Sequence, residues 1–310
     1  MRKWLRRIGL AVLVLVAAVT LAAAGYDLAT GNDFRPAREL YRGPFVQVGR
    51  TLVAYRHWGS AGSPIVLLGG AAEPSWVWHR VGPLLAARGH RVYALDLPPF
   101  GYTERRGPYT LAGWTALVRG FDRRLGITRP LVVGHSLGAG IAAALALAHP
   151  REVRGVVFLD GDGLPVGHGI GWFSNVLVWP WYPALYRLAT GSDWLVGKVL
   201  RNAWGPHRPK VTRSLVDVFQ RPFRVDGTEG AFRALAGRGI PGVSLAELRG
   251  LRVPRAVVWG ADDHVDSLAA GRRTAAALGV RIVVLPRAGH LSMLASPGAT
   301  ATAIESVHTR

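Results

Sequence analysis

Two kinds of apolar segment alternate along most of this 310-residue chain. Short runs rich in Val, Ile and Leu, such as PIVLLGG and RPLVVGH, are typical of strands that are buried on both faces. Longer stretches lie between them, in which apolar positions recur with helical spacing and end at Gly or Pro. Strands that alternate with helices predict an α/β fold with a mostly parallel sheet flanked by helices.

The expected strands and helices form one repeating core. The strand-like runs are FVQVGRTLVAYRHWG (with a hairpin turn at Gly49-Arg50), PIVLLGG, RVYALDL, RPLVVGH, VRGVVFLD, PRAVVWG and VRIVVLP. Helices are expected over residues 76–88, 110–125, 136–150, 267–278 and 297–308. We therefore expect the core to comprise residues 44–160 and 252–310.

The alternation stops between residues 161 and 251. This stretch has helical patches separated by Gly and Pro, and it contains five tryptophans: Trp172, Trp179, Trp181, Trp194 and Trp204. Such aromatic content is untypical of disordered segments, so an insertion of this length predicts a helical cap over a site. Because core packing of so short a segment needs fewer aromatic side chains, we expect several of these tryptophans to line the entrance.

The first 25 residues read as an apolar helix with a basic start. Four cations precede an uncharged stretch from Ile8 to Gly25, which as a helix would span about 27 Å, close to the roughly 30 Å core of a bilayer. This charge asymmetry favours an N-terminus in the cytoplasm and the remainder of the chain outside. Ala22-Ala23-Ala24 also fits a cleavage site, so a membrane signal anchor and a cleaved signal peptide of a secreted protein both remain open. Residues 26–43 are polar and are expected as a linker.

The overall charge narrows the classes of partner. The 38 Lys and Arg residues against 19 Asp and Glu give a formal charge of +19. No basic run reaches five residues, which argues against nucleic-acid binding and leaves an anionic membrane surface as the better match. With no cysteine, disulfides, thiolate nucleophiles and Cys-type zinc sites are excluded. His57, His79, His90 and His149 show no ligand-like spacing, so we expect no metal and no cofactor.

One serine stands in a setting that suits a nucleophile. Gly134-His135-Ser136-Leu137-Gly138 fits the pattern Gly-x-Ser-x-Gly between a predicted strand and a predicted helix. A strand that turns directly into a helix forces the serine into strained backbone, and the glycines let the neighbouring chains approach. The serine oxygen then lies at a helix N-terminus, where free N–H groups stabilise a developing anion.

A serine nucleophile needs a base, and the base needs an orienting acid. Asp263 lies just beyond the strand VVWG, and His290 lies just beyond the strand VVLP. Because the carboxyl ends of parallel strands meet at one edge of a sheet, we expect both residues to lie near Ser136.

Four motifs in this order resemble the α/β-hydrolase superfamily, in its capped branch of esterases and lipases. They are GHSLG, DLPPFGYTE (similar to D-x-P-G-x-G-x-S), WGADDHV and AGH, and the resemblance covers about residues 44 to 308. It implies Ser136 as the nucleophile, His290 as the general base and then acid, and Asp263 as the orienting acid.

The resemblance also implies an oxyanion hole made by the backbone N–H groups of Ala71 and Leu137. Ala71 belongs to the loop LGGAA, in which Gly69 stands where the family usually has histidine. Because the donor is a backbone N–H, Ala71 can still serve. His135 lies in the strand-to-helix turn around Ser136, which is called the elbow, and is expected to have a structural role.

Other carboxylates compete for the role of the acid. Asp262 and Asp266 flank Asp263, and Asp160 ends the preceding strand at a position that some relatives use for the acid. These alternatives remain open at the level of sequence.

We therefore expect a serine hydrolase that cleaves carboxylic esters of apolar substrates through an acyl-enzyme, with its catalytic domain outside the cytoplasm. Serine at the elbow argues against the epoxide hydrolase and haloalkane dehalogenase branches, which the family builds on aspartate. A carbon–carbon bond hydrolase or a cofactor-free haloperoxidase would use the same triad, and a non-catalytic binding module would keep the same fold.

Overall fold

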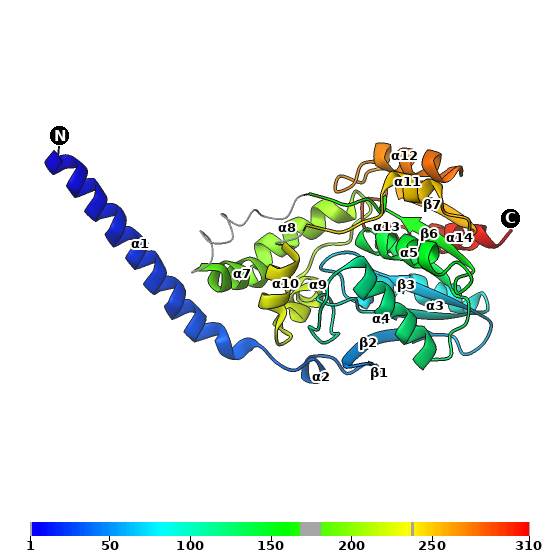
Figure 1. Ribbon diagram of the computed structural model, residues 1–310, viewed down its shortest axis with the longest axis horizontal. Coiled ribbons are helices and arrows are strands. Elements are labelled where there is room, and N and C mark those ends of the chain that lie inside the picture. Colours follow the sequence, from blue (N-terminus) through cyan, green and yellow to red (C-terminus); the bar gives the residue numbers. More distant parts are fainter. Residues whose placement is uncertain (1, 168–180, 237–238, 310) are drawn as a thin grey trace.

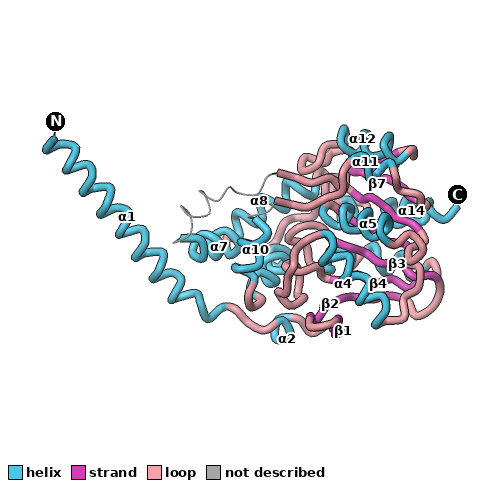
Figure 2. The backbone as a smooth tube through the Cα atoms, in the orientation of Figure 1, coloured by secondary structure: helices cyan, strands magenta, loops and turns pink. Residues whose placement is uncertain are grey.

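The apolar runs expected as strands assemble into one 8-stranded sheet in the computed structural model, which describes residues 2–167, 181–236 and 239–309. The strand order is β1-β2-β4-β3-β5-β6-β7-β8 (Figures 1 and 2). Strand β2 pairs antiparallel with β1 and β4, and the other pairs are parallel. The prediction of a mostly parallel sheet is confirmed.

The central strands are the most deeply buried part of the molecule. The strands are β1 (Phe45–Val48), β2 (Thr51–Trp58), β3 (Ser63–Leu68), β4 (His90–Leu95), β5 (Leu131–His135), β6 (Gly155–Leu159), β7 (Arg255–Gly260) and β8 (Ile282–Leu285). Every residue of β5 and β6 is buried, which explains their uninterrupted apolar sequences. Gly49, with φ +56°, forms the tight turn between β1 and β2 that the sequence predicts.

Helices cover both faces of this sheet (Figure 1). One face packs against α4 (Leu111–Arg124), α5 (Leu137–Ala148) and α12 (Leu268–Leu278). The other face packs against α3 (Val81–Ala87), α13 (Ser292–Ala295) and α14 (Pro297–Glu305). The side chains of Thr110 and Ser267 accept N–H groups in the first turns of α4 and α12, so the starts of these two helices follow from capping chemistry.

The helix expected over residues 76–88 is divided in two. A 3-10 turn, η2 (Ser75–Trp78), is followed by α3, which begins at Val81. Pro83 lies in the first turn of α3, where its missing N–H costs nothing, whereas a continuous helix would force its ring against the carbonyl of His79.

The insertion after β6 is helical, as the sequence predicts (Figure 1). Its described elements are α7 (Tyr182–Gly191), α8 (Asp193–Trp204), α9 (Arg213–Gln220), the 3-10 turn η4 (Arg221–Arg224), α10 (Thr228–Ala236) and α11 (Leu245–Arg249). Ser192, Thr212 and Ser244 cap α8, α9 and α11 through side-chain oxygens.

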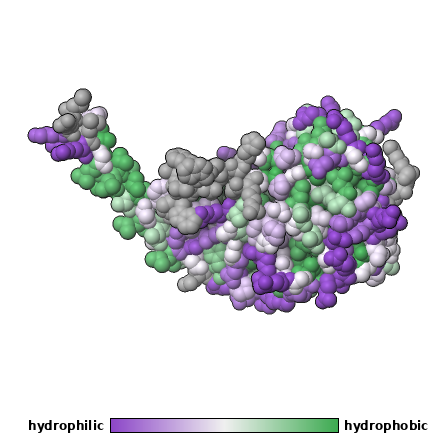
Figure 3. Space-filling model, in the orientation of Figure 1, coloured by the Kyte–Doolittle hydropathy of each residue, from purple (hydrophilic) through white to green (hydrophobic). Residues whose placement is uncertain are grey.

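The N-terminal helix is longer than the apolar stretch suggests. Helix α1 (Arg2–Thr30) projects from the rest of the molecule, and its surface is hydrophobic behind a hydrophilic tip (Figures 1 and 3). Residues 6–30 are long and apolar enough to cross a membrane.

The stretch expected as a linker packs against the fold. It contains η1 (Gly31–Asp33) and α2 (Ala37–Leu40), and Arg35 forms a β-bridge with Val225 of the cap. Tyr41 is buried and stacks on Tyr102, with ring centroids 4.9 Å apart. These contacts join residues that are distant in the chain, so no local pattern predicts them.

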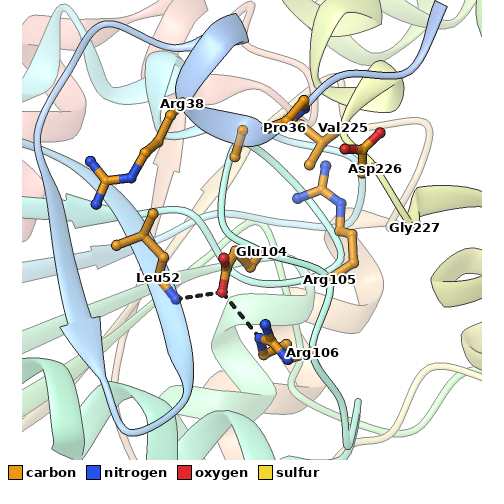
Figure 4. A pocket seen from close by; sticks show the side chains of 10 residues that line it. Pro36, Arg38, Leu52, Glu104, Arg105, Arg106, Val225, Asp226 and Gly227 are labelled. Carbon is orange, nitrogen blue, oxygen red and sulfur yellow. Dashed lines mark hydrogen bonds and ion pairs between the residues drawn. The ribbon is translucent and has the colours of Figure 1, made fainter. Parts of the chain in front are cut away.

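Core, cap and N-terminal segment meet around a hollow of about 420 Å³ (Figure 4). Its lining includes Pro36, Arg38, Leu52, Glu104, Arg105 and Asp226. Arg105 donates to the carbonyls of Gly101 in the core and Pro222 in the cap, both at 2.7 Å. The guanidinium group thus joins the core to the cap. We call this hollow at the junction of core, cap and N-terminal segment the seam.

Candidate active site

The register of the sheet brings four chain segments to one edge. His135 at the end of β5 pairs with Leu159 at the end of β6. Gly260 at the end of β7 pairs with Leu285 at the end of β8. Ser136, Asp160, Asp263 and His290 all follow these strand ends, so the expected convergence occurs.

Ser136 sits in a strained turn between β5 and α5. Its φ of 50° and ψ of −120° are rare for a residue with a side chain, and such conformations cost about 1–3 kcal/mol. The serine N–H donates to the carbonyl of Leu159 at 3.1 Å. The side chain is partly exposed at the start of α5, as a nucleophile requires.

The glycines around this turn are needed for close backbone contacts. A Cβ on Gly134 would lie 2.2 Å from the carbonyl oxygen of Gly138. A Cβ on Gly161 would lie 2.6 Å from the Cα of Ser136. The pattern Gly-x-Ser-x-Gly therefore has the steric basis that the sequence suggests.

His290 and Asp263 form a buried hydrogen bond. Nδ1 of His290 lies 2.8 Å from Oδ2 of Asp263, and the other carboxylate oxygen accepts the N–H groups of Val265 (2.8 Å) and Asp266 (2.9 Å). A carboxylate that accepts these bonds fixes the proton of His290 on Nδ1, so in the neutral ring Nε2 is free to accept a proton.

One of the competing carboxylates, that of Asp160, has other partners. Asp160 accepts the N–H of Gly260 at 2.7 Å, and its second oxygen accepts both the N–H (3.3 Å) and the hydroxyl of Ser292. Burial raises the pKa of Asp160 to about 6. Among these carboxylates it is Asp263 that meets the ring nitrogen of His290.

The loop that follows β3 lies directly against the serine. A Cβ on Gly70 would lie 2.9 Å from the Cβ of Ser136, and Ala71 comes next in the chain. Leu137 is the first residue of α5, and a helix leaves its first N–H groups without an intrahelical acceptor. The two backbone N–H groups expected as oxyanion donors therefore belong to the two segments that flank Ser136.

Glu73 is a residue of this site that the sequence reasoning missed. Its Oε2 lies 2.9 Å from Nδ1 of His135 and accepts the N–H of Gly70 at 2.7 Å. Burial by itself would raise the pKa of Glu73, but the charge of His135 and these hydrogen bonds lower it overall. The only sequence signal was a carboxylate close behind the glycines of the loop.

A small cavity of about 50 Å³ adjoins Ser136. Its lining includes Leu137, Leu164, Val166, Ile240 and Pro241, together with the carboxylates Asp162 and Asp266. In the part of the chain that the structure describes, no group of three or more His, Asp or Glu side chains is arranged to hold a metal ion.

The tryptophans expected at the entrance have other positions. Trp172 and Trp179 lie outside the described residues. Trp204 is buried in the core, the side chain of Trp194 is exposed, and Nε1 of Trp181 donates to Oγ1 of Thr20 in α1 at 3.1 Å. None of these three residues lines the cavity beside Ser136, so the expectation of an entrance lining finds no support at these positions. The core and α1 offer packing partners that periodicity does not reveal.

Comparison with known proteins agrees with this architecture. A family model described as alpha/beta hydrolase fold matches residues 63–297. The dihydrolipoyllysine-residue acetyltransferase component of an acetoin cleaving system from Cupriavidus necator is 30% identical over 266 residues, which are 81% of this chain and 64% of that protein, less than two thirds of its length. A 2-hydroxymuconate semialdehyde hydrolase from a Pseudomonas species is 28% identical over 237 residues, which are 71% of this chain and 78% of that protein.

A solved structure of similar fold is that of a bacterial membrane phospholipase A. The TM-score is 0.70 at 23% identity, and the match covers 100% of both chains.

Proposed function

The chain belongs to the α/β-hydrolase-fold family, and we propose that it is a serine hydrolase that cleaves carboxylic esters of apolar substrates through an acyl-enzyme on Ser136. The observation that carries this proposal is the 2.8 Å hydrogen bond between His290 and Asp263 at the sheet edge where Ser136 sits in its strained turn. A nucleophile, a base and an orienting acid are the groups that acyl transfer needs.

In the proposed mechanism His290 Nε2 takes the proton of the Ser136 hydroxyl as the oxygen attacks the ester carbonyl. The carboxylate of Asp263 stabilises the imidazolium that forms. The N–H groups of Ala71 and Leu137 donate to the oxyanion. His290 then protonates the leaving alcohol, and a water molecule, activated by the same histidine, releases the acid.

An apolar acyl group is supported by the site and by the N-terminal helix. The cavity beside Ser136 has five apolar side chains in its lining, next to Asp162 and Asp266, and each methylene of an acyl chain that is buried against the apolar side contributes about 0.8 kcal/mol. Helix α1 would hold the enzyme where lipid esters are concentrated, and a membrane phospholipase A is among the proteins of similar fold.

We propose that α1 is retained as a membrane anchor, with the catalytic domain outside the cytoplasm. Thr20 of α1 bonds to Trp181 of the cap, and Arg187 of the cap donates to the carbonyl of Asp27 at 2.6 Å. Cleavage after Ala24 would remove the first of these contacts. The cations in the first turn of α1 support the orientation, and the mass of the mature protein tests whether α1 is retained.

A second candidate is hydrolysis of a carbon–carbon bond by the same residues. It is favoured by the similarity to a 2-hydroxymuconate semialdehyde hydrolase. The same serine and histidine would serve, so the substrate assay has to distinguish the two activities.

The experiment combines labelling with substrate comparison. A fluorophosphonate should label the full-length protein on Ser136, and Ser136→Ala should lower p-nitrophenyl ester hydrolysis by a factor on the order of 10⁴ to 10⁶. Ser214→Ala, at an exposed position of α9, is the matched control and should leave activity unchanged. Labelling elsewhere would contradict the proposed nucleophile, and turnover of 2-hydroxymuconate semialdehyde without ester turnover would favour the second candidate.

A further inference from the structure

A buried ion pair joins three segments of the active site. His135, which precedes Ser136, is fully buried, and Glu73 is 8% exposed. Nδ1 of His135 lies 2.9 Å from the carboxylate of Glu73, and Nε2 lies 2.7 Å from the backbone carbonyl of His290. The serine turn, the loop after β3 and the histidine loop are thus connected by one imidazole ring.

Both partners of this ring accept hydrogen bonds. A carbonyl oxygen can only accept, and so can an ionised carboxylate, so the two ring nitrogens must both donate. His135 is therefore an imidazolium with Glu73 as its counter-ion. The other groups that face it are Asp160, whose Oδ2 is 4.0 Å from Nε2, and the ring of His290, with centroids 4.8 Å apart.

The electrostatic balance agrees with this geometry. Burial by itself lowers the pKa of His135, but the charges of Glu73 and Asp160 and the hydrogen bonds raise it to about 9. The ring therefore stays charged at neutral pH.

Glu73 transmits this contact to the loop that flanks the nucleophile. The same carboxylate oxygen that meets His135 accepts the N–H of Gly70 at 2.7 Å. Gly70 lies against Ser136, and Ala71 follows it. Two consecutive glycines make this loop intrinsically flexible, so its position depends on such contacts.

We propose that Glu73 and the charged His135 are positioning residues that clamp the Ala71 N–H and the His290 backbone in the geometry needed for the oxyanion. The inference rests on the proposed function, because it assigns a role within that reaction. An oxyanion donor must lie within about 2.7–3.1 Å of the developing charge, and a 1 Å misplacement can cost about 10²-fold in rate.

The test compares Glu73→Gln with Glu104→Gln in full-length protein in detergent. Glu104 also accepts a backbone N–H, that of Leu52 at 3.0 Å, and pairs with a cation (Figure 4). It lines the seam and not the cavity beside Ser136. With active sites titrated, Glu73→Gln should lower kcat by about 10- to 100-fold with KM changed less than about twofold. Glu104→Gln should leave both constants near wild type.

Two further measurements separate positioning from a general structural role. The affinity for an alkyl trifluoromethyl ketone, whose adduct carries an oxyanion, should fall by the same factor as kcat/KM. The double variant Glu73→Gln/His135→Gln should lose no more activity than the worse single variant, because the pair acts as a unit. Additive losses, or unchanged kcat and ketone affinity in Glu73→Gln, would overturn the proposal.

The charge state of His135 can be tested in the wild-type protein, so the proposal remains testable if a variant fails to fold. Nitrogen-15 NMR of labelled histidine at pH 7 should show one ring that is protonated on both nitrogens and is lost in His135→Gln. A single neutral tautomer for His135 would contradict the proposed pairing of a charged His135 with Glu73. Fluorophosphonate labelling of Ser136 in the same sample distinguishes this failure from failure of the proposed function.

Discussion

At the scale of single residues, the chemistry depends on positions that lack side chains as much as on those that have them. Ser136 is held in its strained turn between glycines whose Cβ atoms would overlap the neighbouring backbone. Gly70 is a comparable position in the loop that follows β3. The approach of these backbones brings the loop that contains Ala71 close to Ser136 and to the start of α5.

Replacing Gly70 by alanine tests this dependence. The added Cβ would lie 2.9 Å from the Cβ of Ser136 and 3.1 Å from both Oε1 of Glu73 and Nδ1 of His135. Because all three neighbours are fixed in the core of the site, we expect the loop to move and kcat/KM to fall by about 10²-fold, with a loss of stability of about 1–3 kcal/mol.

The matched control for this substitution is Gly298→Ala on α14, where an added Cβ meets nothing within 4 Å. It should leave kcat/KM unchanged in the same ester assay. A Gly70→Ala enzyme with wild-type kcat/KM would show that the loop tolerates displacement.

Site residues that directly follow a strand could be predicted from the sequence. Site residues that depend on a contact between distant parts of the chain could not. Ser136, Asp263 and His290 were predictable as candidates because a parallel sheet brings its strand ends together whatever the details of packing. Glu73 and His135 are 62 residues apart, and their pairing depends on side-chain packing inside the site. No spacing rule relates such residues.

At the scale of elements, the amphipathic helix α4 combines an apolar face with a buried carboxyl group. Its apolar face packs Trp114, Val118 and Phe121 against the sheet. Asp122 follows Phe121, and among the described residues its buried Oδ1 has no hydrogen-bond partner. Burial and the nearby charge of Glu152 raise the pKa of Asp122 to about 7.

This raised pKa predicts a pH-dependent cost in stability. Because the pKa in the folded state lies above the ordinary value of 3.8, the fold loses stability as pH rises from about 4 through 7 and the carboxyl ionises. Asp122→Asn removes that ionisation, so we expect its Tm at pH 8 to exceed that of wild type by about 2–4 °C, for roughly 1 kcal/mol. The gain should shrink towards pH 4.

The control is Asp193→Asn at the exposed start of α8, where the side chain is 51% exposed beside Arg213. Thermal unfolding of both variants across this pH range gives the comparison. A gain for Asp122→Asn that is equal at pH 4 and pH 8 would contradict the ionisation argument.

The bounds of helices could be predicted where capping residues and prolines set them. The packing of side chains could not be predicted where it depends on tertiary contacts. The capped starts of α4 and α12 agree with the expected helices, and Pro83 accounts for the break before α3. The placement of the cap tryptophans could not be deduced from local signals. Trp204 packs in the core, and Trp181 forms a hydrogen bond with α1.

At the scale of the whole molecule, α1 is attached to the cap along one stripe. The partly buried positions on its C-terminal half recur at helical spacing and are Thr20, Ala23, Tyr26, Asp27 and Thr30. Arg187 of α7 reaches Asp27 and Thr30 and also pairs with Glu229 of α10. The last turns of α1 are therefore part of the folded domain, while the turns before Thr20 are exposed.

Deleting residues 1–25 should separate membrane attachment from catalysis. The truncated chain keeps Asp27 and Thr30 for Arg187 and loses the Thr20 bond to Trp181, while the sheet and the site make no use of the deleted turns. We expect a protein that needs no detergent and hydrolyses p-nitrophenyl acetate with kcat/KM within about twofold of the full chain. Hydrolysis of long-chain esters embedded in vesicles should fall about tenfold or more, because the anchor no longer raises the local concentration of enzyme at the lipid. Equal losses on both substrates would mean that α1 supports the fold itself, and equal retention on both would mean that attachment does not help the enzyme reach its substrate.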